Sequence, residues 1–262
     1  DFWEGKEPAR SQSIRTWERI RYDLDKLPQQ ATLSTDLLAA VIEHESKPNS
    51  RKRLGMVSNY KRLARLIKLT ELKSLDQLQK KTNYKPKKRD LTGCDDESLA
   101  NLMQKLRHHK KYGWALAALT TYGCRPSEVW SLQPSADGTG RCLDIKEANG
   151  TPQWRTVLAL PQEWVKKFDL RDVQRPLNHN SPEDYDSIEA MKLEKAFGKW
   201  LRYNHPTLQL YDLRHSWAQR QILSGEVGDV LGAQLMGHSI ALHQSTYFQA
   251  MQQRDAVEVA AR

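Results

Sequence analysis

The side chains best suited to chemistry in this 262-residue chain gather near its C-terminal end. The segment Tyr211-Asp-Leu-Arg214-His215 is followed by Gly237-His238, and Tyr247 comes nine residues after His238. Guanidinium groups bind phosphate oxygens through paired N–H donors, and a tyrosine hydroxyl can act as a covalent nucleophile. Together these residue types predict a site that binds a phosphodiester and attacks it.

A second arginine of the same kind occurs much earlier, in the segment Gly123-Cys-Arg125-Pro-Ser-Glu128. Pro126 suits the first position of a helix and Glu128 its first turn, so we expect Arg125 beside a helix N-terminus. The N–H groups and the positive dipole end at such a place bind anions. The alternative for this arginine alone is an exposed loop side chain.

Arg214 repeats this arrangement, because Asp212 could cap a helix and place Arg214 in its first turn. Tyr211 lies three residues before Arg214, so the two side chains share one side of the chain. Three apolar residues at helical spacing are expected to face the core and to turn Arg214 away from it: Leu210, Leu213 and Trp217. The alternative is an ordinary amphipathic helix with a surface arginine.

Gly237 is expected to end a helix over residues 229–236, so His238 would be held in a tight turn. Taken alone, His238 would be a structural hydrogen-bonding group. Tyr247, in the polar segment Gln244–Gln249, would alone be a surface or interface tyrosine. Their candidacy as site residues therefore depends on the arginines.

Two β-rich runs, Arg141–Glu147 and Trp154–Leu160, flank Asn149-Gly150 and predict an antiparallel hairpin. Lys146 lies near the tip of this hairpin, isolated from other lysines in the sequence. It could present its ammonium group to a leaving oxygen, or it could be an exposed strand-end residue.

The elements that must position these side chains are mainly helical. Helical periodicity runs from Ser13 to about Leu78 and returns in the second part, where only the hairpin and a polar loop at Asn178–Asp186 interrupt it. The expected fold class is therefore mainly α (α+β): a helical domain followed by a mixed domain that is mostly helical with a small antiparallel sheet or hairpin.

Composition divides the chain into parts. Lys80–Arg89 holds five lysines and one arginine around a proline, which is typical of a linker. The chain opens on Asp1-Phe-Trp-Glu rather than Met, so we expect a fragment from which an N-terminal part is missing. The expected division is a tail at 1–11, a helical domain at 12–82, a basic linker at 83–91 and a second domain at 92–262.

Two basic features could follow the phosphates of a nucleic acid. A helix is expected after the Pro48-Asn-Ser50 break, with an apolar stripe formed by Met56, Tyr60, Leu63 and Ile67. The basic residues are Lys61, Arg65 and Lys68 on this helix, and Lys85, Lys87, Lys88 and Arg89 in the linker. The alternatives are a solvated helix face and a solvated tether.

The net charge of +9 favours a polyanionic partner. Three cysteines without metal-ligand spacing argue against a disulfide framework or zinc site and favour the reducing cytoplasm. No apolar run approaches the ~20 residues that span a bilayer. The acidic cluster Asp95-Asp-Glu97 suits a helix N-terminus better than a metal site, so no metal or other cofactor is expected.

As an ordered set, these motifs resemble the signature of the tyrosine recombinases, the phage-integrase family: Arg125, Lys146, Tyr211-x-x-Arg214, Gly237-His238 and Tyr247. The resemblance covers residues 92–262 through these motifs. The first part resembles the core DNA-binding domain of that family only in pattern.

This resemblance implies that Arg125, Arg214 and His238 hold the scissile phosphate of double-stranded DNA. Tyr247 would attack that phosphate to form a 3′-phosphotyrosyl link, and Lys146 would protonate the departing 5′-oxygen without a metal. A homo-oligomer on DNA, from dimer to tetramer, and a place on the nucleoid are also implied.

One position departs from the family pattern, which usually has histidine where Tyr211 stands. A phenol can donate a hydrogen bond to phosphate but is a poor base at neutral pH. Two alternatives to a recombinase or integrase follow: a DNA-binding paralogue with impaired catalysis, and a type IB topoisomerase-like enzyme.

Replacing Lys85, Lys87, Lys88 and Arg89 by glutamine tests whether the linker follows DNA phosphates. We expect affinity to fall about equally for all DNA sequences, because phosphate contacts carry no base information. The log–log slope of affinity against salt should flatten by ~0.9 for each phosphate that is no longer neutralised, as measured by fluorescence anisotropy. An unchanged slope would show that the segment is only a tether.

Overall fold

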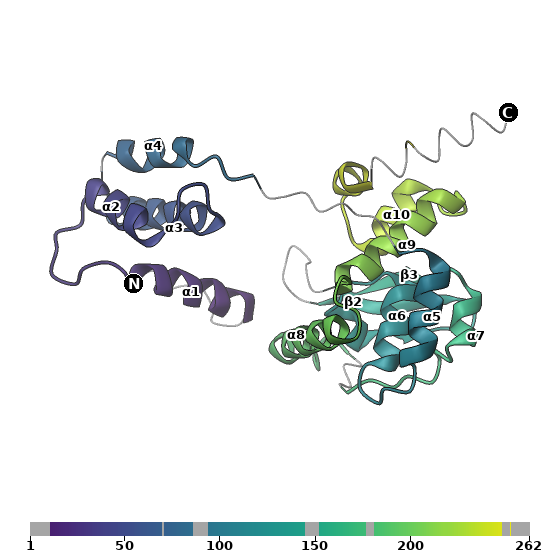
Figure 1. The fold of residues 1–262 in the computed structure, drawn as a ribbon. Coiled ribbons are helices and arrows are strands. Elements are labelled where there is room, and N and C mark those ends of the chain that lie inside the picture. Colours follow the sequence, from purple (N-terminus) through teal and green to yellow (C-terminus); the bar gives the residue numbers. More distant parts are fainter. Residues whose placement is uncertain are drawn as a thin grey trace. The chain divides into compact units, whose positions relative to one another are not determined.

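The computed structural model describes residues 11–69, 71–85, 94–144, 152–176, 181–247 and 252 (Figure 1). By its internal contacts the chain divides into two compact units, Asp1–Arg89 and Asp90–Arg262. Each unit is described below by itself. Residues 1–10 of the expected tail, the turn of the hairpin and most of the basic linker lie outside the described residues, whereas Ser11 already belongs to a helix.

The first unit contains four described helices: α1 Ser11–Leu24, α2 Thr35–Glu45, α3 Arg51–Leu66 and α4 Lys73–Lys81. Ser34 caps α2 by accepting the Leu37 N–H at 3.2 Å, and Ser50 caps α3 by accepting the Arg53 N–H at 3.1 Å. The predicted helix after the Pro48-Asn-Ser50 break is confirmed. In both caps a serine hydroxyl satisfies an N–H that the helix itself cannot.

The core of this unit lies where α2, α3 and α4 meet, and α1 packs against α3. Met56 and Tyr60 are fully buried, as their stripe predicts, and the Tyr60 hydroxyl donates to the Asp23 carbonyl at 2.7 Å. Ile67 does not continue the stripe. It follows the last residue of α3 and is 41% exposed, because the helix ends before the stripe does.

The second unit is mostly helical, with one small antiparallel sheet, so the expected fold class is confirmed. Its described helices are α5 Asp96–Leu106, α6 Gly113–Tyr122, α7 Glu163–Lys167, α8 Ser187–Asn204, α9 Leu210–Ser224 and α10 Asp229–Met236, and residues 240–247 are also helical. Asp95 caps α5 by accepting the Ser98 N–H at 2.7 Å, as the acidic cluster predicts. None of the helices in the described residues is long and apolar enough to cross a membrane.

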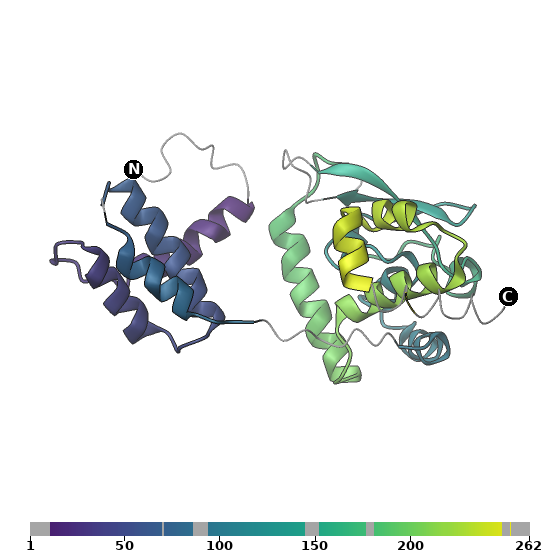
Figure 2. The same cartoon turned by 90° about the horizontal axis from the view of Figure 1, so that it is seen from above.

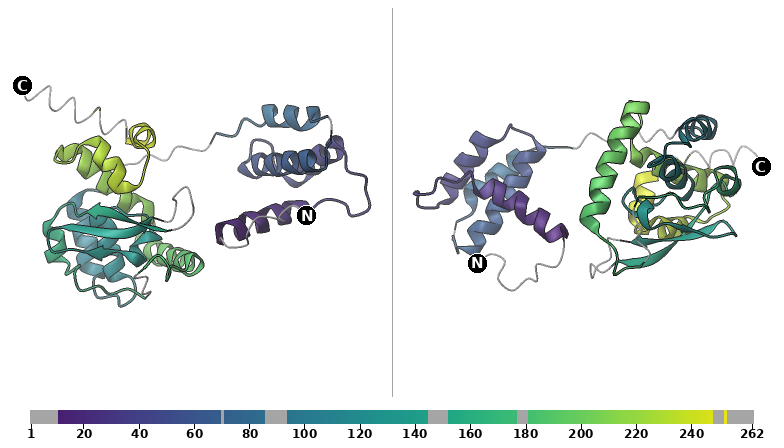
Figure 3. Two further views of the ribbon diagram at one scale, coloured as in Figure 1. Left: turned by 180° about the vertical axis from the view of Figure 1, so that it is seen from behind. Right: turned by 90° about the horizontal axis from the view of Figure 1, so that it is seen from below.

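The sheet has the order β1-β2-β3, with β1 Gln133–Pro134, β2 Thr139–Asp144 and β3 Gln153–Leu158. The predicted hairpin pairs β2 with β3, and its register places Cys142 opposite Arg155. The short strand β1 was not expected from the sequence. Seen from opposite sides, Figures 1 and 3 show the sheet on one face of this unit and the α5–α6 pair on the other.

The helix α6 is buried along its whole length and packs against α9. A second apolar cluster joins α9 and α10 to the end of β3, and it includes Trp217 and Tyr247. The helical residues 240–247, which contain Tyr247, follow α10. Figure 2 shows α8 running as a long helix along one side of the unit. The contacts among α6, α9, α10 and β3 bring together segments that are far apart in the sequence.

Two predicted helix starts are wrong. Only a short 3₁₀ helix, Glu128–Ser131, follows Pro126, because the Glu128 side chain folds back onto the Arg125 N–H. The helix α9 begins at Leu210 rather than after Asp212. Asp212 accepts the Gln209 N–H at 2.7 Å as the third helical residue of a capping box, which places Arg214 in the second turn.

Gly123 ends α6 in the left-handed conformation, with φ of 60°, directly against Trp217 of α9. A Cβ atom there would lie 2.5 Å from the Trp217 ring, so Gly123→Ala combines backbone strain with a steric clash. We expect a loss of about 3 kcal/mol in the free energy of unfolding of the second unit, measured by urea denaturation.

Gly225→Ala is the matched control, because Gly225 has φ of 67° but a Cβ there would meet nothing within 4 Å. Only the backbone strain remains, so this variant should lose about 1 kcal/mol. Equal losses in the two variants would show that the contact between α6 and α9 tolerates an added methyl group.

Candidate active site

A buried carboxylate organises the candidate site. Glu128 is fully buried and accepts the backbone N–H of Arg125 at 2.8 Å. Its two oxygens also pair with the guanidinium groups of Arg125 and Arg155, the latter at 2.5 Å. Since an isolated buried carboxylate is costly, these hydrogen-bonded partners are what allow Glu128 to stay inside.

A second carboxylate, Asp144 at the end of β2, contacts the same two arginines. Its oxygens lie 2.8 Å from Arg125 Nη1 and 3.3 Å from Arg155 Nε. Asp144 is the last described residue before the hairpin turn, so this pairing holds the end of the strand against the loop that carries Arg125.

Arg214 is buried, contrary to the prediction that the apolar face of its helix turns it away from the core. Leu213 and Trp217 are buried as expected, but Arg214 is itself only 1% exposed. Its guanidinium donates to the Gly123 carbonyl at 2.6 Å and to the Met236 carbonyl. These carbonyls lie at the C-terminal ends of α6 and α10, where helix carbonyls need donors, and they draw the arginine inward.

The turn after α10 brings the two predicted arginines to one place. Gly237 ends α10 with φ of 63°, as predicted, and its carbonyl accepts a hydrogen bond from Arg125 Nη2. His238 Nε2 lies 2.9 Å from Arg214 Nη2. A Cβ at Gly237 would lie 2.6 Å from Asp144, so only glycine fits this close approach.

The imidazole of His238 stays neutral at physiological pH. Burial lowers its pKa from the ordinary 6.5 to about 3, and the charges of Arg214 and Arg125 add to the shift. A neutral His238 can donate one hydrogen bond to an anion without adding a charge of its own.

Tyr247 is only 2% exposed, contrary to the surface position that its polar segment suggests. Its hydroxyl lies 2.6 Å from Nδ1 of His215, the residue after Arg214. Its ring centroid is 5.0 Å from that of His243. Burial raises the pKa of the Tyr247 phenol, and the Arg214 charge opposes this shift only in part.

Tyr211 lies one turn before His215 on α9, and their ring centroids are 6.3 Å apart. It is 44% exposed, and partial burial raises the pKa of its phenol above the ordinary 10.0. The structure thus places Tyr211 beside the candidate site as a hydrogen-bonding phenol that stays protonated at neutral pH.

The remaining predicted residues are only partly described. Lys146, Lys87, Lys88 and Arg89 lie outside the described residues, and Lys85 is exposed. The basic stripe on α3 is shorter than expected. Lys61 pairs with Asp76 of α4, and Lys68 lies beyond the end of α3 with φ of 58°. Of the three predicted residues, Arg65 is therefore the one that is both on α3 and exposed.

Comparison with known proteins finds a family match in the first unit. Residues 1–79 match the family model described as the XisA/XisC excisase second domain. Excisase A of Nostoc sp. (strain PCC 7120 / SAG 25.82 / UTEX 2576) is 28% identical over 148 residues, which cover 51% of this chain and 30% of that protein. The aligned part of this chain thus spans under a third of that relative.

Solved structures extend the comparison to both units. The Tn1549 transposon integrase in complex with circular intermediate DNA gives a TM-score of 0.60 at 13% identity, over 94% of this chain and 92% of that one. Lambda integrase, as a tetramer bound to a Holliday junction, gives 0.53 at 13% identity, over 91% and 73%. The fold is that of the tyrosine recombinases. The resemblance that the sequence motifs predict is confirmed at this level.

Three residues of this tyrosine recombinase fold were not predicted as site residues: Arg155, His215 and His243. Arg155 could have been found from the sequence, because it lies two residues before buried Val157 on β3. Alternate residues of a strand share one face, so Arg155 faces inward as well. His243 lies four residues before Tyr247, a spacing that places both on one face of a helix, whereas the spacing of His215 carries no such signal. Only the packing of 240–247 against α9 shows that His215 lies beside Tyr247.

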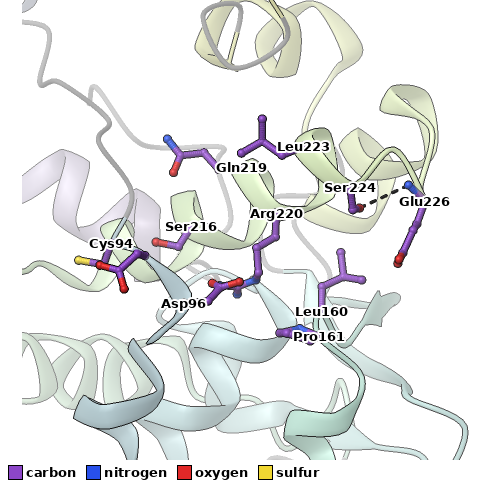
Figure 4. A pocket seen from close by; sticks show the side chains of 11 residues that line it. Cys94, Asp96, Leu160, Pro161, Ser216, Gln219, Arg220, Leu223, Ser224 and Glu226 are labelled. Carbon is purple, nitrogen blue, oxygen red and sulfur yellow. Dashed lines mark hydrogen bonds and ion pairs between the residues drawn. The ribbon is translucent and has the colours of Figure 1, made fainter. Parts of the chain in front are cut away.

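A separate cavity of about 590 Å³ lies between α9, the start of α5 and Leu160-Pro161 (Figure 4). Within it Arg220 and Asp96 point toward one another and pair at 2.7 Å, and Arg220 also stacks over Trp164. As far as the structure describes the chain, no predicted catalytic residue lines this cavity.

No metal centre was expected. Among the residues that the structure describes, no group of three or more His, Cys, Asp or Glu side chains could hold a metal ion. The charges around the Gly237 turn are those of side chains: three guanidinium groups and the carboxylates of Glu128 and Asp144.

Glu128→Gln tests the role of the buried carboxylate in the recombinase fold. The substitution keeps the shape of the side chain but removes the more deeply buried of the two carboxylate charges that Arg125 and Arg155 share, so we expect a loss of about 3 kcal/mol in the free energy of unfolding. Asp25→Asn is the control, because it removes an exposed pair with Arg21 at 3.9 Å and should change stability by less than about 0.5 kcal/mol. Urea denaturation measures both, and similar small losses would contradict the assignment of Glu128.

The depressed pKa of His238 predicts how stability depends on pH. The unfolded chain binds a proton at His238 below its ordinary pKa of 6.5, whereas the folded chain resists protonation down to about 3. The contribution of His238 to stability is therefore present above pH 6.5 and is lost as pH falls towards 3. Urea denaturation at a series of pH values should show a shallower acid loss in His238→Gln than in the wild type, and parallel curves would contradict the burial of a neutral imidazole.

Proposed function

We propose that this chain contains the DNA-binding and catalytic parts of a site-specific tyrosine recombinase that cuts and rejoins DNA strands through Tyr247. The observation that carries the proposal is the convergence at the Gly237 turn. Arg125 contacts the Gly237 carbonyl and Arg214 contacts His238, although these residues come from three separate parts of the sequence.

In the proposed reaction, the guanidinium groups of Arg125 and Arg214 and the N–H of His238 hold the oxygens of the scissile phosphate. Three guanidinium groups against two carboxylates leave one positive charge in excess in this cluster, which suits an anion whose negative charge grows in the transition state. Tyr211 would add a hydrogen bond to a phosphate oxygen from its protonated phenol.

Tyr247 would attack phosphorus, forming the bond from Oη to phosphorus as the bond to the 5′-oxygen breaks. The product is a 3′-phosphotyrosyl link, which keeps the strand end activated for rejoining. Lys146 would protonate the departing 5′-oxygen. All these charges come from side chains, so the proposed reaction needs no metal.

The proposed substrate is double-stranded DNA, with the helical unit binding beside the cut site. Arg65 and Lys85 are exposed there and could contact phosphates, together with the linker lysines. The match to excisases favours excision of a DNA segment as the direction of the reaction. Excision joins two sites, so assembly of several copies on DNA is part of the proposal.

The rival function is a DNA-binding paralogue that does not cleave. The phenol at position 211, which replaces the usual histidine, and the burial of Tyr247 are the observations that favour it. A nicked suicide duplex separates the two functions, because a strand that dissociates after cleavage traps the covalent adduct. A mobility shift without adduct would identify the binder.

Tyr247→Phe tests the proposed nucleophile. On a nicked duplex that the wild-type protein binds and cleaves, we expect complete loss of the protease-sensitive adduct and nearly unchanged affinity, since only one oxygen is removed. Denaturing electrophoresis measures the adduct and a mobility shift measures affinity. An adduct that persisted in the variant would show that another residue is the nucleophile.

A further inference from the structure

The hydroxyl of Tyr247 has a specific partner whose role is not accounted for by phosphate binding. His215 Nδ1 lies 2.6 Å from Tyr247 Oη, and the two rings meet edge to face with centroids 5.6 Å apart. His215 is on α9, immediately after Arg214. The same helix therefore carries a phosphate-binding arginine and a histidine that contacts the nucleophilic oxygen.

Attack by Tyr247 requires that its phenolic proton leave. Burial raises the pKa of this phenol, and Arg214 offsets that shift only in part, so Tyr247 is protonated at neutral pH. A group that accepts the proton must lie within hydrogen-bond reach of the oxygen, about 2.6–3.2 Å. The contact with His215 meets this requirement.

The other candidates beside Tyr247 are less suited. Arg214 has no acceptor atom, and Tyr211 is a phenol whose own pKa is raised by burial. His238 directs its Nε2 at Arg214 rather than at Tyr247. His243 packs beside the Tyr247 ring, and its ring nitrogens have no hydrogen-bond partner among the described residues.

We propose that His215 is the general base of strand cleavage, with Nδ1 accepting the proton of Tyr247 as Oη attacks phosphorus. This proposal rests on the proposed function. Nδ1 can accept the proton when Nε2 carries the ring hydrogen of the neutral imidazole. Tyr211 is a poor base, although a histidine in its place could accept a proton. His215, one turn further along α9, would supply that function instead.

The atoms balance over the two steps. In cleavage, the bond between Oη and phosphorus forms, the bond from phosphorus to the 5′-oxygen breaks, and the phenolic proton moves to His215 Nδ1. The 5′-oxygen takes its proton from the general acid, Lys146 in the proposed reaction. In rejoining, the 5′-hydroxyl attacks the phosphotyrosine, its proton returns to that acid, and His215 returns its proton to the tyrosine oxygen.

Two variants at position 215 separate a base from a structural partner. His215→Asn keeps a side chain that can hydrogen-bond the phenol but cannot take up its proton at neutral pH, and His215→Ala removes both functions. We expect both to slow single-turnover cleavage of the nicked suicide duplex by about 10²–10⁴-fold, with unchanged affinity in a mobility shift. Cleavage by His215→Asn at the wild-type rate would show that the hydrogen bond alone matters and would overturn the proposal.

A change in the nucleophile gives the decisive readout. Difluorotyrosine at position 247, introduced by amber suppression, is a much stronger acid than tyrosine, so its attack depends less on a base. The defect of His215→Ala should therefore shrink at least tenfold in this background. An undiminished defect would show that His215 acts by packing and would overturn the base role.

His243→Ala is the matched control, because it removes an imidazole that packs on the Tyr247 ring without bonding its hydroxyl. Any defect of this variant should stay the same with difluorotyrosine. The outcomes also separate the two proposals. An adduct formed by Tyr247→Phe would contradict the assignment of Tyr247 as the nucleophile. If Tyr247→Phe forms no adduct but His215→Asn is fully active, only the assignment of His215 as the base is contradicted.

Discussion

The buried carboxylate of Glu128 is the constraint on which the candidate site depends. It is fully buried, and it remains so only because Arg125 and Arg155 supply its hydrogen bonds and counter-charge. Those arginines in turn reach Asp144 at the end of β2 and the Gly237 carbonyl after α10. One ionic cluster therefore joins the loop after α6, the sheet and the turn that carries His238.

Hydrogen bonds to carbonyl groups at helix ends are the second interaction that positions the site. Arg214 donates to carbonyls at the C-terminal ends of α6 and α10, where helices leave acceptors without intrahelical partners. The same guanidinium contacts His238, so satisfying the two helix ends also fixes an arginine and an imidazole side by side. The packing of α6, α9 and α10 thus also positions the side chains of the proposed phosphate site. These side chains are held in place by contacts within the protein itself.

Much of the fold follows from local patterns. The helix start after Ser50, the cap at Asp95 and the glycine at 237 depend on contacts within a few residues, so the sequence was enough to predict them. The prediction for Arg214 was wrong. The apolar spacing of Leu210, Leu213 and Trp217 predicts that Arg214 turns away from the core, but the carbonyls that hold it inward lie 91 and 22 positions away. The start of α9 was misplaced because a capping box with Gln209 was not recognised.

The sequence by itself determined which residues have the chemistry to bind and attack a phosphate: two arginines, a histidine and a tyrosine in a fixed order. Residue type and short-range spacing carry that information. The tertiary structure alone decided that Arg155 joins the cluster, that Tyr247 is buried and that its hydroxyl meets His215. Those facts depend on contacts between residues 27 to 112 positions apart, and such contacts are set by how helices and strands pack rather than by any local pattern.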